Sequence, residues 1–246
     1  MNSGEFIHPY KLKQGCRGQS ATEFIVIFPL LIFLVFGIIQ LGLIYQAKST
    51  LNHAAFLAAR AGALNNGKKS DMDSSLAAGL TPLFASEATL IGYAKARAKA
   101  QLEISVARLA TLQVLNPTAA AFQDFGRARL DGGAKREIPN DTLSYRTTGA
   151  GATYGASIQD ANILHLRVTY CYRLIVPVVG RMIRAVSNAL TPFDASLQAT
   201  GLSKPFGDID GPVVDLCSRP FVDGPRIRIR SEAIVRMQSP FYEANF

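Results

Sequence analysis

Few residues of this chain combine the type and the spacing that catalysis or metal binding requires. The 246 residues include three histidines and three cysteines, too few for a multi-ligand zinc or haem site. Neither His53 nor His165 is next to a recognisable nucleophile motif, and no pair of carboxylates has the context of an acid–base pair. The segment 208–211 has the start of a calcium loop, but Pro212 and Val213 stand where an EF-hand needs a ligand and a glycine. We therefore expect no catalytic residue, no metal site and no cofactor.

The charge balance does not select a partner by itself. Lysine and arginine number 26 against 18 aspartates and glutamates, a net charge of +8 that suits nucleic acid, anionic lipid or a polyanionic matrix. The basic cluster at 95–99 is better explained as the solvated face of a helix than as a polyanion site. The glycine run at 149–155 has the spacing GxGxxxG with no strand before it, which excludes a dinucleotide loop. We expect no nucleic-acid partner.

The most informative segment is an uncharged apolar run of 21 residues, Phe24–Ile44. At about 1.5 Å per residue its helix would be about 31 Å long, enough to cross the ~30 Å hydrocarbon core of a bilayer. A buried helix of a soluble core is the alternative, but such a helix is rarely apolar on every side over this length. Three basic residues precede the run and two follow it closely. The positive-inside rule then predicts a single-pass protein with its N-terminus in the cytoplasm and the chain after Tyr45 in the periplasm.

The residues at the start of the run resemble the processing site of type IV prepilins. Gly18 precedes Gln19, and Glu23 stands five residues after the glycine, directly before Phe24. The resemblance implies that a membrane aspartyl peptidase cleaves between Gly18 and Gln19 and releases residues 1–18. It also implies that Glu23, with Phe24 beside it, pairs with the new N-terminal amine of a neighbouring subunit and sets the axial register. We expect the helix macrodipole to stabilise Glu23 in the first helical turn by about 0.3–1 kcal/mol. The alternative to the register role is that Glu23 is a solvated residue at the headgroup level.

A longer stretch, residues 18–64, resembles the TadE-like family of minor pilins, or pseudopilins, of tight-adherence (Tad, type IVc) pilus systems. The shared features are the Glu-Phe entry, an early proline, the Phe-Gly-Ile-Ile turn and the Ala-Ala-Arg-Ala-Gly ending. Shorter motifs at 138–141 and 235–240 extend the resemblance into the second half of the chain. The resemblance implies a pilus-assembly subunit of the inner membrane. Its partners would be a prepilin peptidase, the other major and minor pilins, the inner-membrane assembly platform and membrane lipid.

A second hypothesis belongs to another class of protein. The chain could be an uncleaved, single-pass membrane-anchored periplasmic protein that binds a ligand or adheres to a surface. That hypothesis treats the spacing of Gly18 and Glu23 as a coincidence, so the N-terminal residue of the mature protein distinguishes the two.

Beyond the membrane, the sequence predicts two long helices. The first continues to about Leu64, where Asn65-Asn66-Gly67 ends it with a left-handed glycine. The second is predicted from its N-cap, Ser86, to about Leu115. The apolar line of this second helix is Ile91, Ala94, Ala98, Leu102, Val106 and Leu109. Residues 116–161 are predicted to be irregular, and a short helix is predicted over 180–190.

Two later runs predict strands, because apolar and polar residues alternate along 163–176 and along 226–237. Antiparallel pairing of these strands against the second long helix predicts an α+β fold. The predicted organisation is a cytoplasmic leader over 1–18, a transmembrane and stalk helix over 19–64, and a periplasmic α+β domain over 65–246.

The cysteine prediction depends on processing. Cleavage after Gly18 would remove Cys16 and leave Cys171 and Cys217, an even number in an oxidising compartment. Cys171 would lie on the outer face of its strand, where it could tether the loop that carries Cys217. A disulfide closing these 46 residues would stabilise the fold by about 4 kcal/mol in the chain-entropy model, and two free thiols are the alternative.

Overall fold

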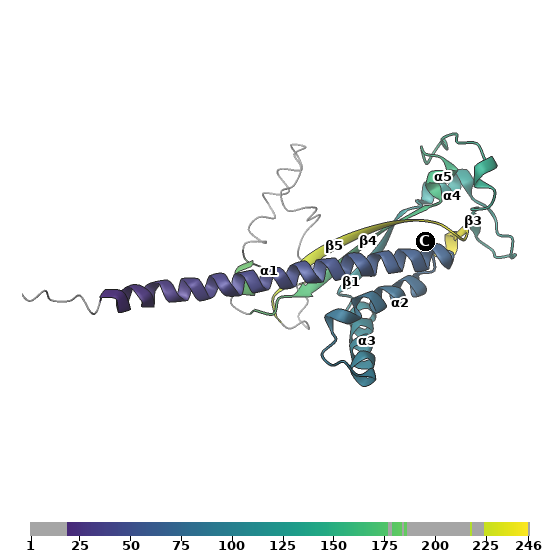
Figure 1. Ribbon diagram of the computed structural model, residues 1–246. Coiled ribbons are helices and arrows are strands. Elements are labelled where there is room, and N and C mark those ends of the chain that lie inside the picture. Colours follow the sequence, from purple (N-terminus) through teal and green to yellow (C-terminus); the bar gives the residue numbers. More distant parts are fainter. Residues whose placement is uncertain (1–18, 177–178, 184, 186–216, 218–223, 246) are drawn as a thin grey trace, which may run out of the picture.

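A single long helix organises the molecule. The computed structural model describes residues 19–176, 179–183, 185, 217 and 224–245. Helix α1 (Gln19–Leu64) contains 46 residues, so it is about 69 Å long. Its N-terminal half, called the inner half below, extends beyond the rest of the protein, and its C-terminal half is called the outer half (Figure 1). It ends at Leu64, as predicted, and the turn that follows closes at Gly67, which has a φ of +74° and whose N–H donates to Gly62 O at 2.8 Å. A side chain at position 67 would also collide with the ring of Phe241.

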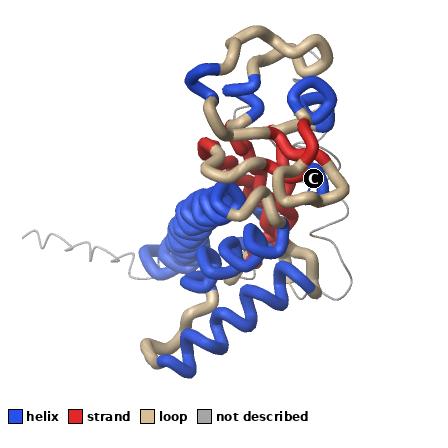
Figure 2. Tube along the Cα trace, turned by 90° about the vertical axis from the view of Figure 1, so that its right-hand side faces the viewer, coloured by secondary structure: helices blue, strands red, loops and turns tan. Residues whose placement is uncertain are grey.

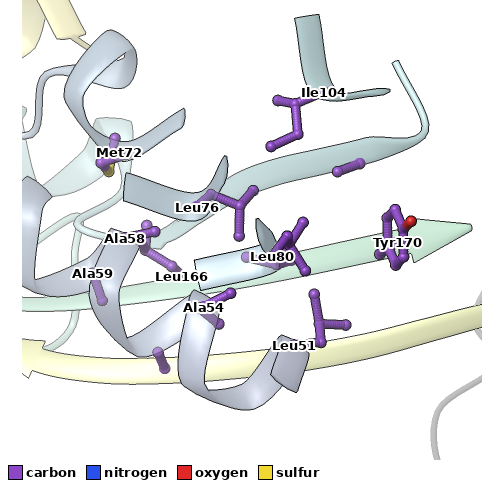
Figure 3. Packing of buried hydrophobic residues seen from close by; sticks show 14 of the residues in the cluster. Leu51, Ala54, Ala58, Ala59, Met72, Leu76, Leu80, Ile104, Leu166 and Tyr170 are labelled. Carbon is purple, nitrogen blue, oxygen red and sulfur yellow. The ribbon is translucent and has the colours of Figure 1, made fainter. Parts of the chain in front are cut away.

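The outer half of α1 is part of the core of the domain. Its buried side is made of small residues with one leucine, and these side chains are fully buried: Ala47, Leu51, Ala54, Ala55, Ala58 and Ala59. Helix α2 (Lys69–Leu80) packs against this side, and Figure 3 shows its Leu76 and Leu80 facing α1. The two helices approach closely because Gly79 has no side chain, and a Cβ there would lie 2.4 Å from the Cα of Ala54.

The second long helix is shorter than predicted. After the 3₁₀ turn η1 (Thr81–Leu83), helix α3 (Leu90–Ser105) begins at Thr89, whose Oγ1 accepts a hydrogen bond from Gly92 N at 3.0 Å. The predicted N-cap, Ser86, and the predicted end at Leu115 are therefore wrong. The helix ends at Ser105, the backbone then becomes left-handed at Arg108, with φ +48°, and Leu109 N donates to Glu103 O at 2.9 Å across the end of the helix.

The predicted apolar line of α3 is wrong for a related reason. Helix α3 packs on α2, and its buried residues are the small Gly92, Ala96 and Ala100 followed by Ile104, whereas Ile91 and Leu102 are exposed. Small residues let two helix backbones approach, so they form the contact here instead of the larger side chains. In Figure 2 α2 lies between α1 and α3, and the three helices form successive layers.

The main sheet contains three antiparallel strands in the order β1-β4-β5. The two predicted strands are confirmed as β4 (Ile163–Arg173) and β5 (Arg226–Arg236), paired antiparallel along their full length. The period-2 alternation holds, with Leu164, Leu166 and Val168 fully buried on the inner face. The third strand, β1 (Ala110–Asn116), lies where the sequence predicted the end of a helix. It forms because its residues pair with β4, for example Val114 with Leu166.

The helix that covers this sheet is α1, which packs against both β4 and β5. Helix α3 was predicted to do so, but it packs mainly on α2 and reaches the sheet at β1 and through Glu103, which accepts a hydrogen bond from Tyr170 of β4. The class is nevertheless the predicted one, a long apolar N-terminal helix followed by an α+β domain with antiparallel sheets.

The region predicted to be irregular forms a second small unit at the end of the molecule farthest from the free half of α1. It contains helices α4 (Ala119–Phe125), η2 (Leu143–Tyr145) and α5 (Ile158–Ala161). Its sheet consists of β2 (Arg127–Ala128), β3 (Arg136–Ile138) and β6 (Phe241–Tyr242), and η3 (Glu243–Asn245) follows. These elements are short and come from segments that are distant in the sequence, so no periodicity in the sequence predicts them. Of the predicted helix over 180–190, residues 179–183 and 185 are helical, and the rest lies outside the described residues.

Candidate functional site

The inner half of α1 presents apolar side chains on every side. Thirteen large apolar side chains between Phe24 and Leu41 are 43–76% exposed, and the rings of Phe24 and Phe28 pack together with centroids 5.1 Å apart. Within the described part of the chain, α1 is the one helix that is long and apolar enough to cross a membrane. The candidate membrane anchor predicted from the sequence is therefore a continuous helix that the rest of the described chain leaves uncovered.

The predicted processing and register residues lie at the start of this helix. Gln19 is the first residue of α1, and Gly18 lies outside the described residues. Glu23 and Phe24 are both exposed. Because α1 begins at Gln19, Glu23 is its fifth residue and the first turn contains no acidic residue. The expected position of Glu23 in the first turn is therefore wrong, and its macrodipole stabilisation is smaller because that effect declines beyond the first turn.

Gln40, near the end of the predicted span, is the first fully buried residue along the described part of α1. Gln40 is fully buried, and its Oε1 accepts a hydrogen bond from Val176 N at 2.9 Å. The sequence shows Gln40 only as a polar interruption of an apolar run. Its partner comes from the segment after β4, 136 residues away, so sequence reasoning could not identify it.

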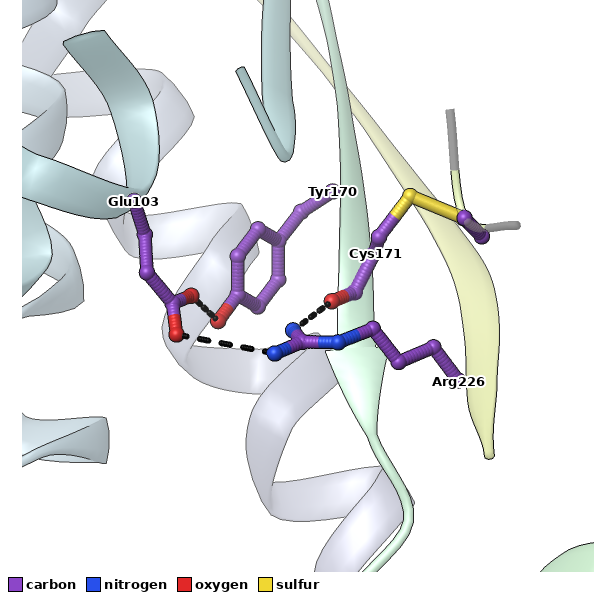
Figure 4. The surroundings of a disulfide bond; sticks show 5 residues. Glu103, Tyr170, Cys171 and Arg226 are labelled. Atoms are coloured by element: carbon purple, nitrogen blue, oxygen red, sulfur yellow. Dashed lines mark hydrogen bonds and ion pairs between the residues drawn. A yellow bond between two sulfur atoms is a disulfide. The ribbon is translucent and has the colours of Figure 1, made fainter. Parts of the chain in front are cut away.

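The structure contains a disulfide between Cys171 and Cys217, whose Cα atoms are 5.4 Å apart. Alternation along β4 puts Cys171 on the outer face of the sheet, but the residue is fully buried and Cys217 is 7% exposed. Figure 4 shows Arg226 beside the disulfide, where its Nη1 donates to Cys171 O at 2.9 Å. The disulfide thus tethers the segment that carries Cys217 to strand β4.

A partly buried polar cluster adjoins the disulfide and joins α3 to the sheet. The hydroxyl of Tyr170 donates to Glu103 Oε2 at 2.7 Å, and Arg226 Nη2 lies 3.9 Å from Glu103 Oε1 (Figure 4). Burial, and then the Glu103 carboxylate, raise the pKa of Tyr170, so the phenol stays protonated at physiological pH. The cluster borders an open cleft of about 600 Å³ between α1, α3 and the sheet. The carboxylate of Glu103 and the guanidinium of Arg226 have opposite charges, so the cluster links α3 to β4 and β5 through a hydrogen bond and an ion pair.

The two histidines considered in the sequence analysis, His165 and His53, lie on the main sheet and on α1. His165 lies on the outer face of the sheet, where its Nε2 is 2.9 Å from Glu232 Oε2, and Arg167 Nε donates to Glu232 Oε1 at 2.6 Å. Burial tends to raise the pKa of Glu232, but the hydrogen bonds from Arg167 and His165 outweigh it and lower this pKa. His53 is an exposed residue of α1. Among the described residues, no group of three His, Cys, Asp or Glu side chains could hold a metal ion.

One comparison identifies what the N-terminal segment is similar to. A family model described as TadE-like protein matches residues 18–60. The match confirms the predicted resemblance over this segment, which consists of Gly18 and most of α1. Searches of curated proteins and of solved structures find no match. The resemblance of the second half of the chain stays a prediction.

Proposed function

We propose that the protein is a minor pilin, or pseudopilin, required for assembly of a Tad-type (type IVc) pilus. One observation carries this proposal. The continuous helix α1 leaves its apolar side chains exposed from Phe24 to Ile39, and most of it lies in the segment 18–60 that matches the TadE-like family, a family of pilus components. The role is that of an assembly subunit rather than of an enzyme.

The exposed helix supports this role because it needs an apolar environment that its own domain does not supply. Full burial of a large apolar side chain stabilises a protein by about 1.5–3 kcal/mol, and thirteen such side chains are exposed here. The bilayer of the inner membrane supplies this environment before assembly, and a bundle of like helices supplies it in a fibre. A subunit that moves from the bilayer into the fibre uses the same apolar side chains in both environments.

The beginning of the chain has a defined part in this proposal. A prepilin peptidase cleaves between Gly18 and Gln19 on the cytoplasmic side and leaves Gln19 as the N-terminal residue. The carboxylate of Glu23 then pairs with the free amine of a neighbouring pilin. A carboxylate within an apolar segment is costly when unpaired, so this pairing would favour a single axial register. The remaining partners are the sibling pilins, the assembly platform and membrane lipid.

The first experiment is to measure the intact mass and the N-terminal residue of the protein from its native membranes. A chain that begins at Gln19 is the expected result. A chain that still begins at Met1 in cells with an active prepilin peptidase would overturn the proposal. It would favour the uncleaved, membrane-anchored periplasmic binding or adhesion protein.

The register role of Glu23 needs its own test. We expect Glu23→Gln to be processed and inserted but not incorporated productively, because the amide keeps the size of the side chain and removes its charge. Glu23→Asp is the matched control, and it should retain part of the assembly. The readouts are the N-terminal residue, the amount in the membrane and the number of pili per cell. Normal piliation in Glu23→Gln would contradict the register role.

A further inference from the structure

The end of the domain nearest the free half of α1 combines exposed apolar and basic side chains. We call this end the foot and define it as residues 173–176 and 179–183. Leu174 and Val179 are buried and attach the foot to the domain, whereas Ile175 is 62% exposed and Met182 is 49% exposed. Two arginines of the foot, Arg173 and Arg181, are exposed as well.

The position of the foot along α1 is set by Gln40. Since Val176 N donates to Gln40 Oε1, the foot is fixed beside the turn of α1 that contains Gln40. Figure 1 agrees, because the ends of β4 and β5 that lead to the foot are beside the middle of α1. The free apolar helix below the foot, residues 24–39, is about 24 Å long. A bilayer has a hydrocarbon core of ~30 Å, so the core must extend to the level of the foot.

A second marker gives the same level. Tyr45 is 78% exposed at the end of the apolar run, and exposed tyrosines are enriched at the membrane–water interface. Tyr45 lies five residues beyond Gln40, which is about 7 Å along the helix. If Tyr45 lies at the outer headgroups, the foot lies below it, within the ~5–10 Å that interfacial elements occupy at the headgroup–acyl boundary.

We propose that the foot is a second membrane contact, immersed in the outer interface of the inner membrane beside α1. Ile175 and Met182 contact the headgroup–acyl boundary, and Arg173 and Arg181 bind lipid phosphates. The burial of Gln40 follows from the same arrangement, because the foot shields its amide from lipid and donates a hydrogen bond to it. The proposal rests on the membrane position of α1 given under the proposed function. It adds that the domain is anchored at a fixed depth and does not rise freely on a stalk.

The chain contains no tryptophan, so single substitutions create unique fluorescent reporters. The full-length protein is reconstituted into mixed phosphatidylcholine–phosphatidylglycerol vesicles, with and without brominated acyl chains that quench tryptophan on contact. The foot reporter is Ile175→Trp, at a position that is exposed and therefore tolerates the larger ring. Phe28→Trp in the apolar helix is the membrane control, and Tyr145→Trp, at a 91% exposed position in the distal unit, is the water control.

We expect brominated lipid to reduce the emission of Ile175→Trp by an amount between those of the two controls, with a blue shift of its maximum. Met182→Trp should behave in the same way and replaces Ile175→Trp if that variant does not fold. Replacing both Arg173 and Arg181 by glutamine should reduce the quenching in these anionic vesicles, and should do so less in pure phosphatidylcholine.

Each remaining outcome refutes one statement. If Phe28→Trp is quenched and both foot reporters behave like Tyr145→Trp, the foot is in water and the inference fails while the membrane position of α1 stands. If a foot reporter shifts to the blue without quenching, a second protein chain covers the foot and the inference also fails. If Phe28→Trp is not quenched, the membrane position of α1 itself is wrong.

Discussion

The substitution Leu51→Ala tests whether the outer half of α1 belongs to the folded domain or is a free stalk. Leu51 is fully buried in the core cluster that α1 forms with α2 and the main sheet (Figure 3). Truncating a fully buried leucine removes transfer free energy and leaves a cavity, which together cost about 2.7–5 kcal/mol. At about 2–4 °C per kcal/mol for a domain of this size, the Tm should fall by roughly 5–20 °C.

The matched control is Leu64→Ala, which makes the same chemical change on the same helix at a side chain that is 49% exposed. Its Tm should change by less than about 2 °C, because substitutions at exposed surfaces rarely exceed ±0.5 kcal/mol. Both variants are unfolded by heat in detergent micelles, which cover the apolar half of α1 equally. The signal is the near-ultraviolet circular dichroism of the tyrosines, because they report the packing of the domain whereas α1 stays helical in detergent.

A result in which Leu51→Ala loses no more stability than Leu64→Ala would refute this reasoning. It would mean that α1 separates from the domain before the domain unfolds, so that the small residues along its buried side serve contacts with other subunits. A large loss in both variants would instead show that Leu64 is covered in solution, in contradiction to its exposure.

Two further predictions concern the outer face of the sheet. Because the hydrogen bonds of Glu232 lower its pKa in the folded state, its contribution to stability is complete above the ordinary glutamate pKa of about 4.3 and is lost as the pH falls through the lower folded value. Glu232→Gln should therefore be less stable than the parent protein near neutral pH and should lose less stability on acidification, which urea midpoints across the acid range would check. Equal pH profiles would show that Arg167 and His165 do not stabilise the carboxylate. Cys171→Ser opens the 46-residue loop to Cys217 and should lower the free energy of unfolding by about 4 kcal/mol, an effect that a reducing agent should reproduce in the parent protein but not in the variant. An unchanged urea midpoint for Cys171→Ser would contradict this account of the bridge.

The sequence by itself determined the elements that local patterns specify. An uncharged apolar run predicts α1. Gly67 predicts where the helix stops, because the turn after the helix needs a left-handed backbone that glycine adopts without strain. The period-2 alternation predicts β4 and β5 with their inner faces, because a strand with one buried face must alternate. The entry motif around Gly18 and Glu23 predicts the TadE-like resemblance, which the match over 18–60 confirms.

Only the tertiary structure decided what each face packs against. Leu112 and Val114 carry an apolar pattern that suits a helix or a strand, and pairing with β4 makes them a strand. Ala96 and Ala100 form the buried side of α3 because α2 is close enough to require small residues. Gln40 is buried because a segment 136 residues away folds back onto it. An apolar pattern indicates which face can be buried, but the surface that buries it comes from residues distant in the chain, and only the folded structure brings them together.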